Sequence, residues 1–172
     1  MELKFRKGTL DDVELFVAFL EKVKAEMTQQ EWFYLDPPDT VREMMADGTM
    51  ELWVAMDDNR MAAAFDILHP GLASFNYGYD LGLTEEELMQ VVHMDTSAVQ
   101  KDYRGMGLQR KMVQTAEMAL NGQGRKILLC TVHPDNCYSL NNMLKQGYAI
   151  QKRVAKYGSE RLLLRKDIFL KK

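Results

Sequence analysis

One stretch near the middle of the chain limits the possible folds more than any other. Residues 91–99 are rich in β-branched and apolar side chains, and the glycine turn Gly105-Met106-Gly107 follows them. The apolar positions after the turn have helical spacing: Leu108, Met112, Val113, Ala116, Ala119 and Leu120. A strand that leads through a glycine turn into an amphipathic helix indicates a mixed α/β domain.

The flanking segments extend this pattern over the whole chain. We expect strands at 3–6, 50–56, 60–68, 91–99, 126–132, 148–155 and 161–165, and helices at 10–27, 40–46, 108–120 and 136–146. Residues 28–38 are irregular, and residues 71–90 form a long loop with one helical turn. The element order is βααβββαβαββ, without repeats or a linker, so residues 1–172 are expected to form a single domain.

Several classes of protein are excluded by simple features of the sequence. No apolar run approaches the ~20 residues of a membrane span, and the first eight residues lack the apolar core of a signal peptide. Only two cysteines occur, and neither CxxC nor HExxH is present. We therefore expect a cytoplasmic protein with no membrane partner and no metal site.

The net charge of -3 hides two halves of opposite sign. Residues 1–100 carry 7 basic and 20 acidic side chains, whereas residues 101–172 carry 15 basic and 5 acidic. This asymmetry fits either two domains or two binding faces of opposite charge. The basic tail 152–172 lacks a platform of stacking aromatic residues, so no nucleic-acid partner is expected.

The glycine turn has the features of an anion site. Glycines let backbone N–H groups approach an anion closely, and a helix N-terminus adds donors and a positive dipole end. Arg104, Arg110 and Lys111 add full charges around the same turn, which suits a pyrophosphate. The alternative is that the two glycines only permit a tight turn. The third glycine of a dinucleotide fingerprint is missing, and no GxxxxGK[ST] motif exists.

Two motifs in the second half resemble a known family. Arg104-Gly105-Met106-Gly107-Leu108-Gln109 resembles the Q/R-x-x-G-x-G/A signature of the GCN5-related N-acetyltransferases. Asn136, followed eleven positions later by Gly147-Tyr148, resembles the N-x(10)-G-[FY] helix of the same family. The resemblance implies an acyl-CoA N-acyltransferase fold (GNAT-like), a mixed, mostly antiparallel sheet splayed at the cofactor strand and flanked by helices.

The same resemblance implies a cofactor and its binding residues. Acetyl-CoA would lay its pantetheine arm along the end of the strand, its pyrophosphate on the loop amides, and its far side against the helix at 136–146. The implied contacts are Val99, Gln100, Lys101, Arg104, Gly105, Met106, Gly107, Leu108, Gln109, Arg110, Asn136, Ser139 and Asn142. For Asn136, capping of the helix N-terminus is an equally good interpretation.

The sequence departs from the family pattern at two positions. Gln109 stands where the family prefers Gly or Ala, which we expect to alter only the packing of the loop. Met143 stands where the family commonly has a tyrosine that protonates the departing thiolate, and a thioether cannot donate a proton. Activity would then rely on Tyr77, Tyr79 or water, or would be reduced.

A base is also required, because an alkylamine is mostly protonated at pH 7 and only its neutral form attacks a thioester. His93 and Asp95 lie on one face of the strand at 91–99. Arylalkylamine acetyltransferases of the family carry histidines at these two positions, so both residues are candidates for a catalytic base or proton relay. The alternative is that they hydrogen-bond neighbouring loops.

We expect the binding site for the acceptor amine to be lined by acidic and aromatic side chains. Residues 26–51 hold seven acidic side chains and one basic, with Trp32 and Tyr34 among them, and Tyr77 and Tyr79 in the second loop would face them. Carboxylates and aromatic faces attract a cationic amine. The alternative is a solvated acidic face above packed aromatics.

These features lead to one main hypothesis and two alternatives. The main hypothesis is an acetyl-CoA-dependent N-acetyltransferase that acts on a small, cationic primary amine by direct attack in a ternary complex, as a monomer or homodimer. An acyl-CoA-binding sensor with weak turnover is the first alternative, favoured by Met143. A protein N-terminal or lysine acetyltransferase is the second.

Overall fold

The structure is a computed structural model that describes residues 3–168; residues 1–2 and 169–172, the end of the basic tail, lie outside it. Its α-helices are α1 (Val13–Ala25), α2 (Pro38–Ala46), α3 (Glu85–Leu88), α4 (Leu108–Ala119) and α5 (Cys137–Lys145). Its strands are β1 (Lys4–Lys7), β2 (Met50–Asp57), β3 (Arg60–Leu68), β4 (Val91–Val99), β5 (Ile127–Val132), β6 (Ala149–Lys156) and β7 (Ser159–Asp167). Short 3-10 helices are η1 (Leu10–Asp12), η2 (Gln30–Trp32), η3 (Tyr77–Leu81) and η4 (Lys101–Tyr103). The expected element order is confirmed.

Several boundaries differ from the expectation by a few residues, and three differences have a clear local reason. The first helix begins as η1, because the Asp12 carboxylate accepts from the Thr9 N–H (2.8 Å) and from both terminal nitrogens of Arg6 (2.7 Å each). The loop 71–90 carries both η3 and α3, and Thr84 and Glu87 form a capping box on α3. Strand β7 is four residues longer than expected, because the turn after β6 has only two residues.

The chain folds into two compact units, each made of two segments. The first unit comprises 1–67 and 96–116, and the second comprises 68–95 and 117–172. Strand β4 contributes its beginning to the second unit and its end to the first. The hydrogen-bonded strand order is β1-β2-β3-β4-β5-β7-β6 in one seven-stranded sheet, which is mixed and mostly antiparallel.

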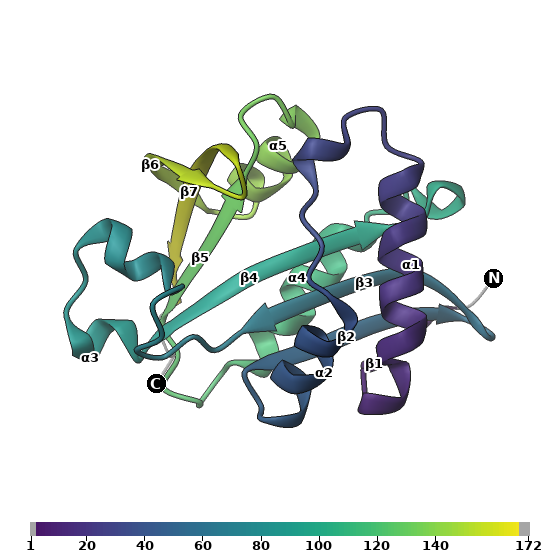
Figure 1. Cartoon of the computed structure of the whole chain (residues 1–172), viewed down its shortest axis with the longest axis horizontal. Helices are drawn as coiled ribbons and strands as arrows, with labels where there is room; N and C mark the ends of the chain where they lie inside the picture. Colours follow the sequence, from purple (N-terminus) through teal and green to yellow (C-terminus); the bar gives the residue numbers. More distant parts are fainter. Residues whose placement is uncertain (1–2, 169–172) are drawn as a thin grey trace. The chain divides into compact units, whose positions relative to one another are not determined.

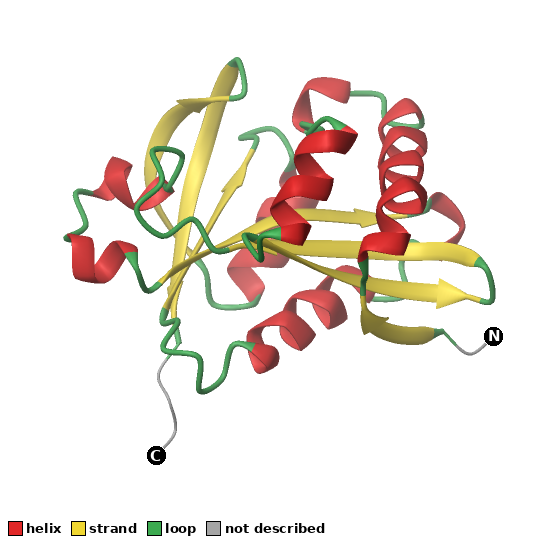
Figure 2. Cartoon of the chain, turned by 60° about the horizontal axis from the view of Figure 1, so that its bottom comes forward, coloured by secondary structure: helices red, strands yellow, loops and turns green. Residues whose placement is uncertain are grey.

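In the first unit, strands pack between helices. β1 runs antiparallel to β2, from Lys4 opposite Met56 to Lys7 opposite Trp53. Helices α1 and α2 cover one face of these strands and α4 covers the other (Figures 1 and 2). Buried apolar side chains from α1, α2, β2, β3 and α4 form the core: Val13, Phe16, Val41, Leu52, Ile67, Met112 and Val113. Burial of such a core is the main driving force for folding.

In the second unit, the strands surround a smaller core. β4 and β5 are parallel from Val91 and Ile127 to His93 and Leu129, and β7 pairs antiparallel with both β5 and β6. The core contains Tyr77, Val91, Ile127, Leu129, Val154 and Leu163. Tyr148, the aromatic residue of the second motif, is buried and donates to Glu117 (2.8 Å), which also binds Lys166 (2.7 Å). This motif residue therefore links α4, β6 and β7.

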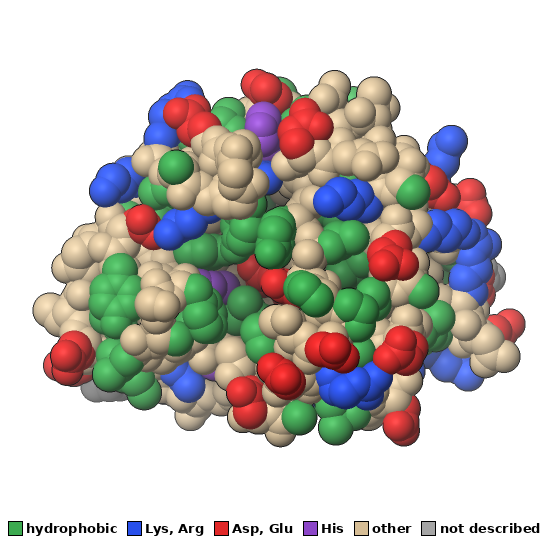
Figure 3. Space-filling model, in the orientation of Figure 1, with side chains coloured by type: hydrophobic (Ala, Val, Ile, Leu, Met, Phe, Trp, Pro, Cys, Tyr) green, Lys and Arg blue, Asp and Glu red, His purple; other side chains and the backbone are tan. Residues whose placement is uncertain are grey.

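The charge asymmetry between the sequence halves is smaller between the units. The first unit has 11 basic and 16 acidic side chains and the second has 11 and 9, because each unit takes a segment from each half. Acidic and basic side chains occur together on the face in Figure 3. Within residues 3–168, no helix has the length and apolar character needed to cross a membrane. No group of three or more His, Cys, Asp or Glu side chains in that range could hold a metal ion.

Candidate active site

The loop after β4 is held by contacts inside the first unit. The Gln100 N–H donates to the Ala62 carbonyl (2.9 Å), and the buried Tyr103 hydroxyl donates to Asp57 (2.6 Å). Arg60 donates through Nε to the Gln100 Oε1 (2.9 Å) and through a terminal nitrogen to Asp102 (2.7 Å). Gln100 is 4 % exposed, so its polar groups serve to fix the loop.

The two glycines of the turn have backbone conformations that favour glycine. Gly105 has φ 81° and Gly107 has φ 70°, in the left-handed region. A Cβ at either position would meet nothing within 4 Å, so the concave side of the turn is open. The left-handed φ values are what a tight turn requires, so they fit the tight-turn alternative as well as an anion site, and the open space beside both glycines leaves room for an anion.

The first turn of α4 completes this loop. Leu108 is buried and anchors the start of the helix, and the Lys111 N–H closes the first helical bond on the Gly107 carbonyl (3.1 Å). The N–H groups before Lys111 have no partner within the helix, as in any α-helix. Lys101, Arg104 and Arg110 are exposed, Val99 and Gln109 are partly buried, and Met106 is 50 % exposed. Free backbone donors, a helix dipole and exposed cations fit a pyrophosphate.

A buried, unpaired hydroxyl lies on the strand that leads to the loop. Ser97 Oγ is buried and has no hydrogen-bond partner among residues 3–168. Such a group is costly unless a ligand or water satisfies it. It adds a donor and acceptor beside the end of β4 in the same unit as the loop.

Helix α5 of the second unit carries the other predicted cofactor residues. Asn136 is its N-cap, and its Oδ1 accepts from the Ser139 N–H (3.2 Å), as the alternative interpretation predicted. Asn142 lies one turn further along, and its buried Nδ2 has no partner among the described residues. An unsatisfied donor at this position fits a polar ligand such as a pantetheine amide.

Met143 leaves the usual acid position without a proton donor. Its side chain is on α5 and is 4 % exposed, so it belongs to the packed core. Tyr138 on the same helix is 89 % exposed and does not replace the missing acid.

His93 is held as a neutral imidazole. It is 1 % exposed, its Nε2 accepts from the Tyr77 N–H (3.0 Å), and its ring stacks on the Tyr77 ring with 3.8 Å between centroids. Burial, together with the charge of Lys156, lowers the pKa of His93 to about 3. The Nε2 lone pair of His93 already accepts a hydrogen bond from a backbone N–H. The geometry therefore favours a structural role for His93 over a role as catalytic base.

Asp95 acts electrostatically on a phenol and a thiol of the second unit. It is partly buried on β4, and its charge contributes to raising the pKa of Tyr77 and of Cys130, although burial is the larger cause for both. The Tyr77 hydroxyl bonds to the Tyr157 hydroxyl. Asp95 is therefore a partly buried carboxylate whose charge acts on Tyr77 and Cys130, and it is the candidate base whose surroundings leave that role open.

The aromatic residues that are predicted to contact the acceptor amine lie in both units. Trp32 is in η2 of the first unit, and Tyr34 follows it with 49 % exposure. In the second unit Tyr77 is buried, whereas Tyr79 is 49 % exposed and donates to the Leu72 carbonyl (2.9 Å). That Trp32 and Tyr34 face the second loop stays a prediction.

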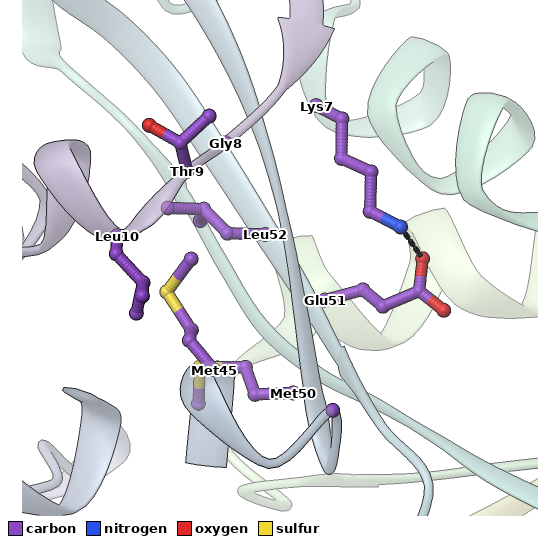
Figure 4. A pocket seen from close by; sticks show the side chains of 9 residues that line it. Lys7, Gly8, Thr9, Leu10, Met45, Met50, Glu51 and Leu52 are labelled. Carbon is purple, nitrogen blue, oxygen red and sulfur yellow. Dashed lines mark ion pairs between the residues drawn. The ribbon is translucent and has the colours of Figure 1, made fainter. Parts of the chain in front are cut away.

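The first unit also contains a pocket that is not lined by any predicted site residue. It has a volume of about 250 Å³ between β1, η1 and the start of β2, with Met45, Met50 and Leu52 on its walls (Figure 4). Its two charged residues, Lys7 and Glu51, pair with each other (2.6 Å), and it includes none of the predicted site residues. It offers no unpaired group for chemistry.

The sequence matches the family model described as acetyltransferase (GNAT) family over residues 19–148. This range contains the glycine loop, Asn136 and Gly147-Tyr148. The chain belongs to the GNAT acetyltransferase family.

Solved structures of GNAT acetyltransferases share the fold of this one. A GNAT acetyltransferase from Streptococcus pneumoniae has a TM-score of 0.76 at 17% identity, covering 98% of this chain and 100% of that chain. The paia N-acetyltransferase from Thermoplasma acidophilum, in complex with coenzyme A, has a TM-score of 0.73 at 10% identity, covering 98% and 100%. The ribosomal-protein-alanine N-acetyltransferase from Brucella melitensis has 0.72 at 15%, covering 96% and 100%. No curated protein matches the sequence.

Two groups of residues in this acetyltransferase were missed by the sequence analysis. Arg60 and Tyr103 fix the glycine loop, and Tyr157 joins Tyr77. Arg60 lies forty residues before its partner Gln100, so no local pattern connects them. For Tyr157, the signal was a tyrosine before Gly158 in a two-residue turn, where Asn or Asp is the usual choice.

Proposed function

We propose that this GNAT protein is an acetyl-CoA-dependent N-acetyltransferase that acetylates a primary amine of a small, cationic acceptor, as a single domain. The observation that supports it best is the glycine loop, with its two left-handed glycines open to solvent at the start of α4. Solved relatives with the same fold include one in complex with coenzyme A. The unsatisfied Ser97 and Asn142 side chains fit the polar arm of the same cofactor.

Each group of residues has a proposed role in the reaction. Acetyl-CoA supplies the activated acetyl thioester. The loop from Arg104 to Arg110 binds the pyrophosphate, and Asn142 hydrogen-bonds the pantetheine. Backbone N–H near Val99 stabilises the oxyanion that forms when the amine attacks. Asp95 accepts the proton of the attacking amine, because His93 has its free lone pair engaged by Tyr77.

The acceptor class rests on charge and aromatic character. Trp32 and Tyr34 occur in the acidic stretch 26–51, and the first unit has five more acidic than basic side chains. Exposed aromatic faces and carboxylates bind ammonium groups better than neutral or anionic ones. A small cationic amine is the acceptor that these residues favour.

The test is acceptor-dependent release of CoA thiol. The purified chain is incubated with acetyl-CoA and with polyamines, aminoglycosides, amino acids, or peptides that carry a free N-terminus or lysine. We expect release only with small cationic amines. Release only with peptides would overturn the acceptor class in favour of a protein acetyltransferase.

An acyl-CoA-binding sensor with weak turnover is the second candidate function. It is favoured by Met143, which cannot donate a proton at the position where the family commonly has a tyrosine acid. It predicts tight binding of acetyl-CoA in calorimetry with no acceptor-dependent release for any amine. That result would overturn the enzymatic proposal while leaving the cofactor loop in place.

A further inference from the structure

Two tyrosines far apart in the sequence share a hydrogen bond in the second unit. The hydroxyl of Tyr77 in η3 bonds to the hydroxyl of Tyr157, which lies in the turn between β6 and β7, eighty residues away. Both residues belong to the second unit, as do Asp95 and Met143. The pair therefore lies in the same unit as the candidate base and as the position that lacks the usual acid.

The backbone of Tyr157 is strained. Lys156 and Ser159 pair across the turn, and Tyr157 (φ 55°) and Gly158 (φ 74°) are both left-handed, as in a type I′ turn. A non-glycine side chain in this region costs about 1–2 kcal/mol, and Asn or Asp tolerates it better than an aromatic residue. Strained backbone conformations of this kind are concentrated at functional sites. Here the residue in the strained conformation is the one whose hydroxyl bonds to the Tyr77 hydroxyl.

Tyr77 is fixed on several sides and keeps its proton. Its ring stacks on His93 and its N–H donates to that imidazole. The Lys156 ammonium lies 5.6 Å from the ring centre and pairs with Asp80 (2.7 Å). Burial first, and then the charge of Asp95, raise the pKa of the Tyr77 phenol, which makes it a hydrogen-bond donor and a poor source of phenolate.

Tyr157 differs from Tyr77 in exposure. Its side chain is 42 % exposed, against 4 % for Tyr77, so solvent reaches part of it, and the Arg161 guanidinium lies 5.8 Å from its ring centre. A nearby cation stabilises the phenolate that remains when a tyrosine gives up its proton. Tyr79, the other tyrosine of η3, has its hydroxyl bound to the Leu72 carbonyl and is not part of the pair.

We propose that Tyr157 is the general acid that protonates the departing thiolate in this enzyme, and that Tyr77 is the positioning residue that holds the Tyr157 hydroxyl. The inference rests on the proposed N-acetyltransferase function. The amine lone pair forms the new C–N bond, the C–S bond breaks, and its electron pair leaves on sulfur. The Tyr157 O–H proton passes to sulfur, the amine proton passes to Asp95, and water restores the proton on Tyr157.

The first experiment compares Tyr157→Phe with the wild type, with Tyr138→Phe, at an 89 % exposed tyrosine of the same unit, as the matched control. Removing a general acid lowers turnover by about 10²-fold, while the KM for acetyl-CoA and the melting temperature stay the same. The defect should shrink above about pH 8.5, because the thiol then leaves as a stable thiolate. A structural role for Tyr157 predicts no such pH dependence.

The second experiment needs no turnover. In the free protein with ¹³C-labelled tyrosine, the Tyr157 ring resonance is assigned with the Tyr157→Phe variant and titrated. Loss of the Tyr77 hydroxyl in Tyr77→Phe should move the Tyr157 midpoint by about half a pH unit or more, and Tyr79→Phe should not move it.

The outcomes separate the two proposals. A wild type with no acceptor-dependent CoA release overturns the enzymatic function and, with it, the acid. An active wild type whose Tyr157→Phe variant turns over equally fast from pH 6 to 9 overturns only the role of Tyr157. An unmoved midpoint in Tyr77→Phe overturns the positioning role of Tyr77.

Discussion

The glycine loop of the first unit and the Tyr77–His93–Tyr157 cluster of the second are built on opposite principles. The loop presents backbone N–H groups and exposed cations, and its shape depends on two left-handed glycines. The cluster presents side-chain hydroxyls and a neutral imidazole, and its properties depend on burial. An anion can be bound by a short contiguous segment, whereas control of protons in a low-dielectric environment requires residues from distant parts of the chain.

The largest effect is expected from a charge placed in the loop. Gly107→Asp adds a carboxylate to the anion site and a side chain at φ 70°. We expect acetyl-CoA affinity to fall by more than about 100-fold in calorimetry, which corresponds to roughly 2.7 kcal/mol. Gly122→Asp is the matched control, because Gly122 is also left-handed (φ 81°) with open space around it. Unchanged affinity in Gly107→Asp would show that the loop does not hold the pyrophosphate.

The next largest effect concerns the base of the second unit. Asp95→Asn retains the shape of the side chain and removes its proton acceptor. We expect kcat to fall by about 10- to 100-fold, with the acetyl-CoA dissociation constant nearly unchanged. Steady-state kinetics with a small amine and binding calorimetry measure the two quantities separately. Turnover equal to that of the wild type across pH 6–9 would remove Asp95 as the base.

The imidazole of the cluster predicts an acid-sensitive stability. His93 binds a proton near pH 6.5 in the unfolded chain but only near pH 3 in the folded chain. Between these values the unfolded state binds more protons, so stability falls as the pH is lowered, by at most about 1.4 kcal/mol per pH unit. Urea unfolding of the wild type from pH 7 to 4 should show this slope, and His93→Gln should reduce it.

A carboxylate of the first unit provides the control for this slope. Hydrogen bonds from Arg6 hold the pKa of Asp12 well below its usual value, so its contribution is lost only as the pH falls below about 4. Asp12→Asn should therefore leave the slope between pH 6.5 and 4 unchanged. An equal slope in the wild type and in His93→Gln would contradict the neutral, buried state of His93.

The smallest effect is expected at the support of the loop. Arg60→Ala removes the bonds to Gln100 and Asp102. Asp102 is exposed and binds water instead, and loss of the half-exposed guanidinium lets water reach the buried Gln100 amide. We expect a several-fold loss of acetyl-CoA affinity and little change in melting temperature, since exposed ion pairs contribute little to stability. Arg153→Ala removes a comparable exposed pair with Glu160 and should leave the affinity unchanged. Equal affinities in both variants would show that the loop is fixed without Arg60.

These two regions also show what the sequence can predict. The element order, the loop and the capping role of Asn136 follow from short-range patterns, because glycine φ values, helix caps and alternation act within a few residues. The engagement of His93 by Tyr77 and the Tyr77–Tyr157 bond depend on contacts over sixteen and eighty positions. The charge asymmetry of the sequence halves is reduced in the units for the same reason, because each unit draws on both halves.

The strained turn at Tyr157 has a consequence for how such a chain evolves. Asparagine suits a left-handed turn position better than tyrosine does, and a single base change converts a tyrosine codon into an asparagine codon. Mutation alone would therefore move this position toward a more stable hairpin without the phenol. In a library randomised at this codon, selection for thermal tolerance should enrich asparagine, glycine and aspartate, whereas selection for acetyl transfer should retain tyrosine.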